Sequence, residues 1–211
     1  MTAPPRPDWG EGSLGLERLV FFSDAVFAIA ITLLVLEIRV PELPHGVSSG
    51  ELARRVLGLW HEALAFVISF LVIGLFWARH HQFYHYIARF DGRLLWLNLL
   101  VLLCVAFLPF PTALLSRYND TQFAVAFYAG YLALVGLLMA LLWSYAAAAG
   151  LVAPDLDRGV VRHHTLRLLG ASAIFLLSIG VSFASPVAAH YCWALIALVR
   201  PLTVRLTRVP H

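Results

Sequence analysis

The sequence predicts an all-α integral membrane protein with six transmembrane helices in one chain. Of its 211 residues, 61% are hydrophobic and 13% are charged, whereas soluble domains are nearer half apolar and a quarter charged. The mean hydropathy is +0.81. Six apolar stretches each approach the length of about 20 residues that crosses a hydrocarbon core as a helix. The connections between them are too short to form a large soluble domain.

Proline residues mark several boundaries of the predicted spans. Pro41 and Pro44 end the first span, Pro154 interrupts the chain after the fourth, and Pro186 starts the sixth. Arg200 shortens the apolar run of the sixth span, which is therefore the weakest. The six spans are expected at residues 19–38, about 57–78, 94–115, 123–150, 166–184 and about 186–204.

The distribution of arginines predicts that both chain termini are cytoplasmic. The 15 basic residues are all arginine, and eleven fall in the N-terminal tail, the 79–93 and 151–167 loops and the C-terminal tail. Short cytoplasmic loops carry such an excess of basic residues. We therefore expect a multi-pass protein of the inner (plasma) membrane, with a cytoplasmic tail at 1–16, a single six-helix transmembrane domain at 17–206 and a second cytoplasmic tail at 207–211. No basic patch predicts binding to nucleic acid.

The first span begins with polar side chains, Arg18, Ser23 and Asp24. A carboxylate about one and a half turns into a span is costly against hydrocarbon and should face protein, water or a partner. Two interpretations remain open: Ser23 and Asp24 cap the helix at the headgroup level, or they mark a side that faces protein.

Farther along the same span, apolar residues form one stripe on the helix. Ile29, Leu33 and Leu36 follow the i, i+4, i+7 spacing of a single helical face. Thr32 lies beside this stripe and is the one polar residue within the apolar run.

The stretch LFWARHHQFYHYIARFDGR after the second span is rich in aromatic and basic residues. An aromatic and basic belt at the membrane interface is the plain interpretation. His81 and His85 have the i, i+4 spacing of a metal-ligand pair, although no further ligands with supporting spacing follow. A third interpretation is a polar network in which Trp77 and a histidine bond to the Ser23–Asp24 end of the first span. Asn98, a lone amide near the same boundary, favours the network because such residues bond across helices.

Catalytic and cofactor motifs are missing from the sequence. The run HEALA at His61 lacks the second histidine of H-E-x-x-H, and there is no G-x-S-x-G, phosphate-binding glycine loop or C-x-x-C. The carbonyl filter motif T-V-G-Y-G is absent too. We therefore expect no enzymatic activity, no cofactor and no metal site.

Three motifs resemble one known family. The pattern R-x-x-x-F-S-D at Arg18, Phe22, Ser23 and Asp24, followed by AVFAIAITLLVLEI, resembles the first-helix signature of the transmembrane protein 175 (TMEM175) family. The family comprises lysosomal and endosomal potassium channels of animals and their bacterial relatives. The segments FWARHH at 76–81 and NLLVLLCVAFLPFPTALL at 98–115 are similar to its second and third helices. The last three spans match only in number and hydrophobicity.

The resemblance implies a homotetrameric, potassium-preferring cation channel. The first helix of each chain would line a central pore that narrows at hydrophobic side chains, with potassium or other monovalent cations in the pore and membrane lipid around it. Carried over on the F-S-D motif, the pore layers fall on Ile29, on Thr32 or Leu33, and on Leu36. The polar network at the cytoplasmic end carries over to Arg18, Ser23, Asp24, Trp77, His80 and Asn98, with His80 chosen over His81 by the W-x-x-H spacing.

Two other classes of function are weighed against the channel. Asp24 would be the coupling carboxylate of a small proton-coupled secondary transporter, but the chain shows no inverted repeat. A membrane enzyme or redox protein would use His61, His80 or His190 as ligands, but no catalytic or haem spacing accompanies them. In the channel, Asp24 and Glu37 near the pore mouths would raise the local cation concentration.

Overall fold

The computed structural model of the chain describes residues 13–196 and 199, and within them the regular elements are helical apart from one isolated antiparallel bridge between Ile87 and Val152. The all-α class is therefore confirmed. The helices, with η for 3₁₀ turns, are α1 (Ser13–Leu33), η1 (Leu34–Glu37), α2 (Ser49–Gly58), α3 (Trp60–Tyr86), α4 (Gly92–Phe107), α5 (Pro109–Arg117), α6 (Gln122–Ala148), α7 (Arg158–Ser182), α8 (Pro186–Cys192) and η2 (Trp193–Leu195).

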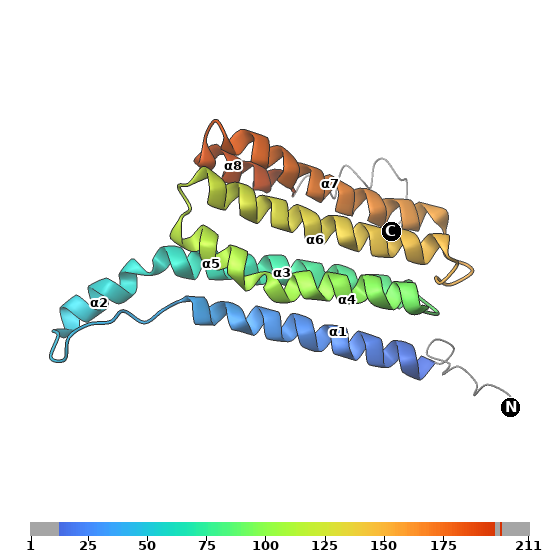
Figure 1. Cartoon of the computed structure of the whole chain (residues 1–211), viewed down its shortest axis with the longest axis horizontal. Coiled ribbons are helices and arrows are strands. Elements are labelled where there is room, and N and C mark those ends of the chain that lie inside the picture. The colour runs from blue at the N-terminus through green and yellow to red at the C-terminus, as the bar shows by residue number, and fades with distance from the viewer. Residues whose placement is uncertain (1–12, 197–198, 200–211) are drawn as a thin grey trace, which may run out of the picture.

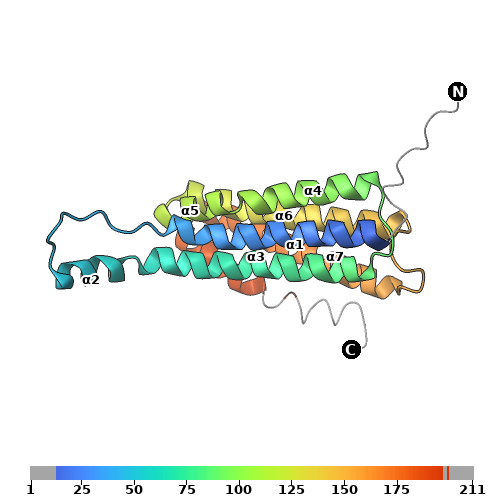
Figure 2. The same ribbon diagram turned by 90° about the horizontal axis from the view of Figure 1, so that it is seen from below.

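The long helices run side by side in three layers (Figure 1). α1 forms one outer layer, α3 with α4 and α5 forms the middle layer, and α6 with α7 and α8 forms the other outer layer. Seen from below, α1 lies between α3 and α4 (Figure 2). It packs on both of them, so one side of α1 is covered by the chain and the other is not.

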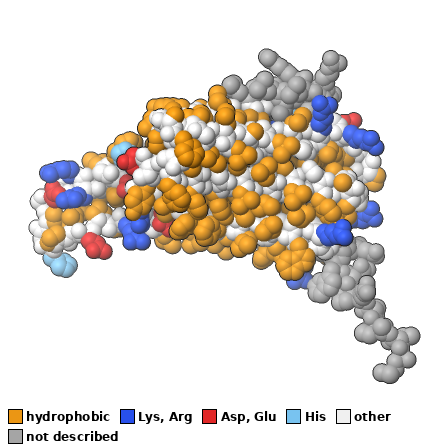
Figure 3. Space-filling view, turned by 45° about the horizontal axis from the view of Figure 1, so that its top comes forward, with side chains coloured by type: hydrophobic (Ala, Val, Ile, Leu, Met, Phe, Trp, Pro, Cys, Tyr) orange, Lys and Arg blue, Asp and Glu red, His pale blue; other side chains and the backbone are white. Residues whose placement is uncertain are grey.

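Five helical segments are long and apolar enough to cross a membrane, which agrees with five of the six predicted spans. They are Leu14–Glu37, Trp60–Tyr86, Gly92–Arg117, Gln122–Ala148 and Arg158–Ser182. Apolar side chains cover the middle of the bundle, and charged side chains gather toward its two ends (Figure 3). Of the sixth predicted span, α8 and η2 account for Pro186–Leu195, whereas 197–198 and 200–204 lie outside the described residues, as do 1–12 and 205–211 of the predicted tails.

Several predicted boundaries were wrong, and each difference has a local cause. α3 continues to Tyr86, so the expected 79–93 loop is reduced to residues 87–91. No proline or glycine interrupts residues 79–86, and Phe83 and Tyr84 extend the buried face. α7 begins at Arg158, eight residues before the predicted 166–184 span, because Asp157 caps its first turn by accepting from Gly159 N.

The third predicted span is a pair of helices. α4 ends at Phe107 and α5 begins at Pro109, which occupies the first turn where its missing N–H costs nothing. The short helix α2 was not predicted; Ser48 caps it, and Glu51 pairs with Arg54 and Arg55 at 2.9 Å. α2 has no buried residue and, with the 38–48 connection, extends beyond the bundle (Figure 1).

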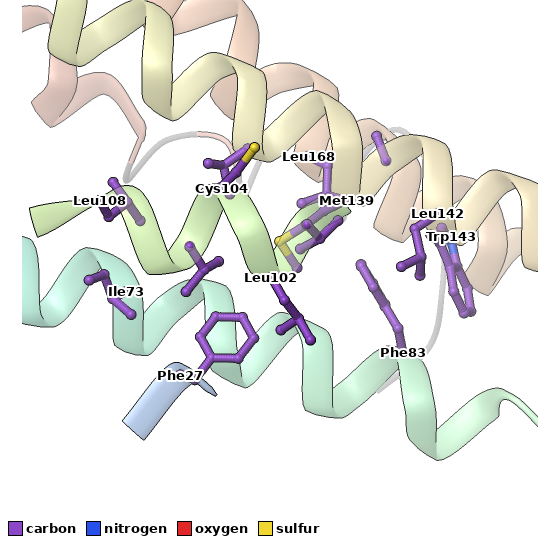
Figure 4. Packing of buried hydrophobic residues seen from close by; sticks show 14 of the residues in the cluster. Phe27, Ile73, Phe83, Leu102, Cys104, Leu108, Met139, Leu142, Trp143 and Leu168 are labelled. Carbon is purple, nitrogen blue, oxygen red and sulfur yellow. The ribbon is translucent and has the colours of Figure 1, made fainter. Parts of the chain in front are cut away.

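The core is a continuous apolar cluster drawn from all three layers. Phe27 of α1, Ile73 and Phe83 of α3, and Met139 and Trp143 of α6 are buried in it (Figure 4). The Phe83 and Trp143 rings stack with centroids 4.8 Å apart. Within a bilayer, lipid tails are as apolar as these side chains, so close packing rather than removal from water stabilises the contact.

Hydrogen bonds join the two loops at the end of the bundle where α1 begins. The amides of Ala88 and Arg89 donate to Leu151 O at 2.9 and 3.1 Å, and Ala153 N donates to Tyr86 O at 2.9 Å. These bonds tie the α3–α4 loop to the α6–α7 loop. The middle and outer layers are therefore connected at this end by backbone as well as by packed side chains.

Asp91 adds a side-chain connection at the same end. Its Oδ1 accepts from Leu94 N at 2.8 Å and caps α4, while Tyr145 OH of α6 donates to Oδ2 at 2.6 Å. Burial raises the pKa of Asp91, but these hydrogen bonds to the carboxylate outweigh burial and hold the pKa below its usual value of 3.8.

Asp91→Ala is expected to lower the stability of the bundle by about 1–2 kcal/mol at neutral pH, because it removes a helix cap and the partner of Tyr145. Since the folded-state pKa is depressed, this stabilisation is present above the unfolded-state pKa and is lost as the pH falls through the folded-state pKa. The difference in Tm between wild type and variant, measured by intrinsic fluorescence, should shrink below about pH 4. A constant difference down to pH 3 would contradict this role; Asp155→Ala, an exposed position nearby, is the control.

Candidate functional site

α1 has a covered face and an open face. The covered face carries Leu19, Ser23, Phe27, Ala30 and Leu34, whose exposed fractions are between 0% and 6%. These positions follow the i, i+4, i+8 period of a helix with one step of three, so they form a single stripe against α3 and α4. The orientation of α1 about its own axis is therefore defined by this stripe.

The open face carries the four residues predicted to line a pore. Ile29 is 58% exposed, Leu33 42% and Leu36 69%, and Thr32 is exposed as well. We call these four residues the outer face of α1. The Thr32 hydroxyl lies 3.1 Å from Ala28 O and 2.9 Å from Ile29 O, so its single proton is donated to the backbone of its own helix.

The 3₁₀ turn η1 changes the register of the outer face. In a 3₁₀ helix, side chains three residues apart eclipse one another. Since η1 starts directly after Leu33, Leu36 lies above Leu33, whereas Thr32 is rotated from Leu33 by about 100°. Leu33, Leu36 and Glu37 line a groove of about 500 Å³ bounded by Phe107 and other residues of α4 and α5.

A chain of buried hydrogen bonds connects α3, α4 and α1. His80 Nε2 lies 2.7 Å from Asn98 Oδ1, Asn98 Nδ2 donates to Ser23 Oγ at 3.0 Å, and Ser23 Oγ donates to Leu19 O at 2.8 Å. The three side chains are 0–1% exposed. When His80 Nε2 carries a proton, His80 donates to Asn98, Asn98 donates to Ser23, and Ser23 donates to Leu19 O, so these three donors each have an acceptor. We call these three residues the polar cluster.

Asp24 and Trp77 form a second link at the edge of the polar cluster. Trp77 Nε1 donates to Asp24 Oδ1 at 2.8 Å, joining α3 to α1. Trp77 is 40% exposed, so this bond is accessible where the polar cluster is not. Five of the six residues predicted for the network thus lie in two adjacent links. Arg18 is exposed and, among the described residues, makes no hydrogen bond or ion pair with the other five.

The histidines outside the polar cluster are dispersed. His81 is exposed and packs against the Trp77 ring at a centroid distance of 5.6 Å, and His85 is exposed beside Tyr86. Within residues 13–196 and at 199, no group of three or more His, Cys, Asp or Glu side chains is placed to hold a metal ion. The cysteines Cys104 and Cys192 are free thiols.

A second buried polar group was missed in the sequence. Thr112 Oγ1 donates to Ser69 Oγ at 3.0 Å, and Ser69 Oγ lies 3.2 Å from Tyr128 OH, which joins α3, α5 and α6 toward the opposite end of the bundle. Ser69 and Thr112 each stand as lone hydroxyl residues inside apolar runs, and that isolation was the available signal.

The fold and both polar groups define a multi-pass helical membrane protein, and comparison with known proteins specifies its family. The sequence model of the endosomal/lysosomal potassium channel TMEM175 matches residues 18–109. A potassium channel of Streptomyces collinus is 39% identical over 186 residues, covering 84% of this chain and 89% of that protein. A potassium channel of Chamaesiphon minutus is 40% identical over 172 residues, covering 80% and 84%.

A solved structure agrees with the sequence relatives. The crystal structure of a lysosomal potassium-selective channel TMEM175 homologue from Chamaesiphon minutus superposes with a TM-score of 0.77 at 35% identity, covering 90% of this chain and 99% of that one. The chain belongs to the TMEM175 family. This confirms the resemblance seen in the F-S-D motif, and membership of an ion-channel family confirms the expectation that the chain is not an enzyme.

Asn98→Leu should lower the stability of the protein by about 1–3 kcal/mol, because it leaves His80 Nε2 and Ser23 Oγ without their shared partner in an apolar interior. Asn119→Leu is the matched control, since it removes the same side chain from an exposed loop and should change stability by no more than about 0.5 kcal/mol. Thermal unfolding in detergent measures both. Equal Tm values for the two variants would show that the polar cluster contributes nothing to stability.

Proposed function

We propose that the chain is the subunit of a potassium-preferring cation channel of a bacterial inner membrane, assembled as a homotetramer around a central pore lined by α1. The names of its relatives support a potassium channel. The observation that carries the proposal is the outer face of α1, where the large apolar side chains of Ile29, Leu33 and Leu36 are left exposed by the described residues of their own chain. Four such stripes facing a common axis would bury one another in a ring.

The spacing of the outer face favours three successive constrictions. Ile29 and Leu33 are separated by four α-helical residues, which is about 6 Å along the axis. Leu33 and Leu36 are separated by three residues of 3₁₀ geometry, also about 6 Å. Rings of four branched side chains at these levels would exclude water from a narrow pore, and such a constriction stops ion flow by dewetting.

The register created by η1 supports Leu33 rather than Thr32 as the middle layer. Leu33 and Leu36 border the same groove, so they share one side of α1. The Thr32 hydroxyl donates its hydrogen bond to the backbone of its own helix. Only an oxygen lone pair, beside the stripe of Ile29, Leu33 and Leu36, would then be available to passing cations. Selectivity would then arise from partial dehydration, which potassium undergoes more readily than sodium.

The polar cluster supports a structural role at the cytoplasmic end of the pore helix. It connects α1 to α3 and α4 through neutral side chains, so it holds α1 in place without adding charge to the interior. Asp24, bonded to Trp77, directly follows Ser23 at the accessible edge of the polar cluster, where its carboxylate would also attract cations. The exposed Arg18 is the network member that would reach a neighbouring subunit.

The same proposal covers the domain organisation and the orientation of the chain in the membrane. Residues 17–206 would form a single channel domain whose sixth span begins with α8, and both termini would be cytoplasmic, as the excess of arginines at that end indicates. No cofactor is required, because the only species that the pore must bind are the permeant cations.

Recordings from purified protein in planar bilayers test the proposal. Discrete single-channel currents and a reversal potential shifted toward potassium under a potassium/sodium gradient are the expected results. Slow, saturable flux that depends on a proton gradient, without discrete currents, would instead identify a proton-coupled transporter.

Leu36→Ala and Ile29→Ala should each raise the conductance or reduce the preference for potassium, because a wider and less apolar ring holds water more readily. The matched control is Leu141→Ala, which truncates a leucine of α6 that is 52% exposed. If both α1 variants conduct like wild type in the same bilayer assay, the assignment of the pore to the outer face of α1 is wrong.

Asp24→Ala should lower the yield and stability of the tetramer more than it changes ion preference, since it breaks the link to Trp77. Size-exclusion chromatography and reversal potentials measure the two effects separately. Trp77→Phe, which removes only the indole donor, should reproduce the loss of stability. An intact, stable tetramer with an altered ion preference would overturn the structural role of Asp24.

A further inference from the structure

α6 ends and α7 begins at the end of the bundle where α1 also starts (Figure 1). A pocket lined by arginines lies at this junction of α6 and α7. It encloses about 820 Å³ between the last turn of α6, the 150–156 connection and the first two turns of α7. Arg89, Arg158 and Arg162 line it together with Ser144 and Thr165. We call it the arginine pocket. The ion path proposed above uses none of these residues.

Backbone hydrogen bonds hold part of the lining of the arginine pocket. Val152, a lining residue, pairs with Ile87 in the isolated bridge, and Gly150, with φ of +66°, turns the chain after α6. Arg89 Nη2 donates to Gly150 O at 3.2 Å, which orients this arginine along the pocket edge. The pocket is therefore preorganised by paired loops, and a ligand would order few additional groups on binding.

The charge of the pocket favours an anion. Among the described residues, no acidic side chain lines it, and the nearby Asp157 uses its carboxylate to accept from Gly159 N at the start of α7. Arg158 and Arg162 stand at i, i+4 on α7, where like charges repel, so an anion bridging them would relieve that repulsion. The N-terminal turn of α7 adds the positive end of its helix dipole.

The carbonyls at the end of α6 already accept hydrogen bonds from the following turn: Leu151 N donates to Ala146 O at 2.9 Å, and Gly150 N donates to Ala147 O at 3.3 Å. The side chains of Arg158 and Arg162 are exposed and so remain accessible from solvent or from the membrane surface.

Apolar residues make up another part of the lining, which we call the apolar wall. Its members are Ala147 of α6, Val152, Pro154 and Leu156 of the connection, and Leu166 of α7. The pocket also lies at the ends of the candidate spans Trp60–Tyr86, Gln122–Ala148 and Arg158–Ser182, and helices of this length end near the lipid headgroups when they cross a bilayer. A ligand that satisfies both walls has a negatively charged group and an attached apolar chain, whereas a free phosphate ion would leave the apolar wall uncovered.

We propose that the arginine pocket binds one anionic phospholipid, with the headgroup phosphate between Arg158 and Arg162 and the glycerol and upper acyl chain against the apolar wall. Basic pockets between transmembrane helices at the cytoplasmic side bind phospholipid headgroups in this way. The lipid would tie the α6–α7 loop to the membrane surface. Because this site does not depend on ion conduction, it is tested by binding alone.

The experiment compares dioleoyl phosphatidylglycerol with dioleoyl phosphatidylcholine, each titrated in detergent into the purified full-length protein. Retained lipid is counted by native mass spectrometry, and the rise in Tm is measured in parallel. Phosphatidylglycerol should bind and raise the Tm, whereas phosphatidylcholine should do neither. R158Q/R162Q should weaken phosphatidylglycerol binding about 30-fold, at roughly fivefold for each arginine lost near a membrane surface.

Matched variants separate the pocket from general charge. R54Q/R55Q removes two arginines from the exposed helix α2 and should bind phosphatidylglycerol like wild type. Ala148→Trp fills the pocket from an exposed position without changing charge, and it should also abolish binding. If R158Q/R162Q fails to fold, phosphatidylglycerol binding by Ala148→Trp tests the proposal in its place.

Three results would overturn the proposal. Equal binding of the two lipids would remove the anion specificity, and unchanged phosphatidylglycerol binding by R158Q/R162Q or, if that variant fails to fold, by Ala148→Trp would place the lipid elsewhere. Inorganic phosphate that competes with phosphatidylglycerol at equal concentration would show that the pocket is a site for a free anion and not for a lipid.

Discussion

The hydrogen-bond chain from His80 through Asn98 to Ser23 determines the orientation of α1 in this protein. α1 is apolar almost all round, so hydrophobicity alone gives it no preferred face in a bilayer. A polar atom in hydrocarbon must find a partner, and the buried Asn98 Nδ2 meets Ser23 Oγ only when that side of α1 faces α4. With Ser23, Phe27 and Leu34 turned inward, Ile29, Leu33 and Leu36 are necessarily turned outward.

The two ends of the bundle are built differently. At the end where α1 begins, Asp91, Tyr145 and the paired loops connect the layers, and the arginine pocket lies on this rigid platform. At the other end, α2 and its connection extend beyond the bundle with no buried residue.

Much of this arrangement could be read from hydropathy and motifs. The fold class, five spans and the family follow from apolar length and from R-x-x-x-F-S-D. Boundaries were less accurate, because helices continue past the apolar core wherever capping allows: α3 runs on to Tyr86, and Asp157 starts α7 early. Ser69 and Thr112 were missed, since a hydroxyl in an apolar run reveals its partner only when the other helices are in place.

The sequence by itself determined that the chain crosses a membrane, where α1 lies and which residue types stand along it. These properties depend on composition and on the period of one helix, which are local. Tertiary structure alone decided which side of α1 the stripe of Ile29, Leu33 and Leu36 faces, because Asn98, which holds the opposite side inward, lies 75 residues from Ser23 in the chain. It also decided that Arg89, Arg158 and Arg162 share one pocket, since they are brought together by two loops far apart in the chain.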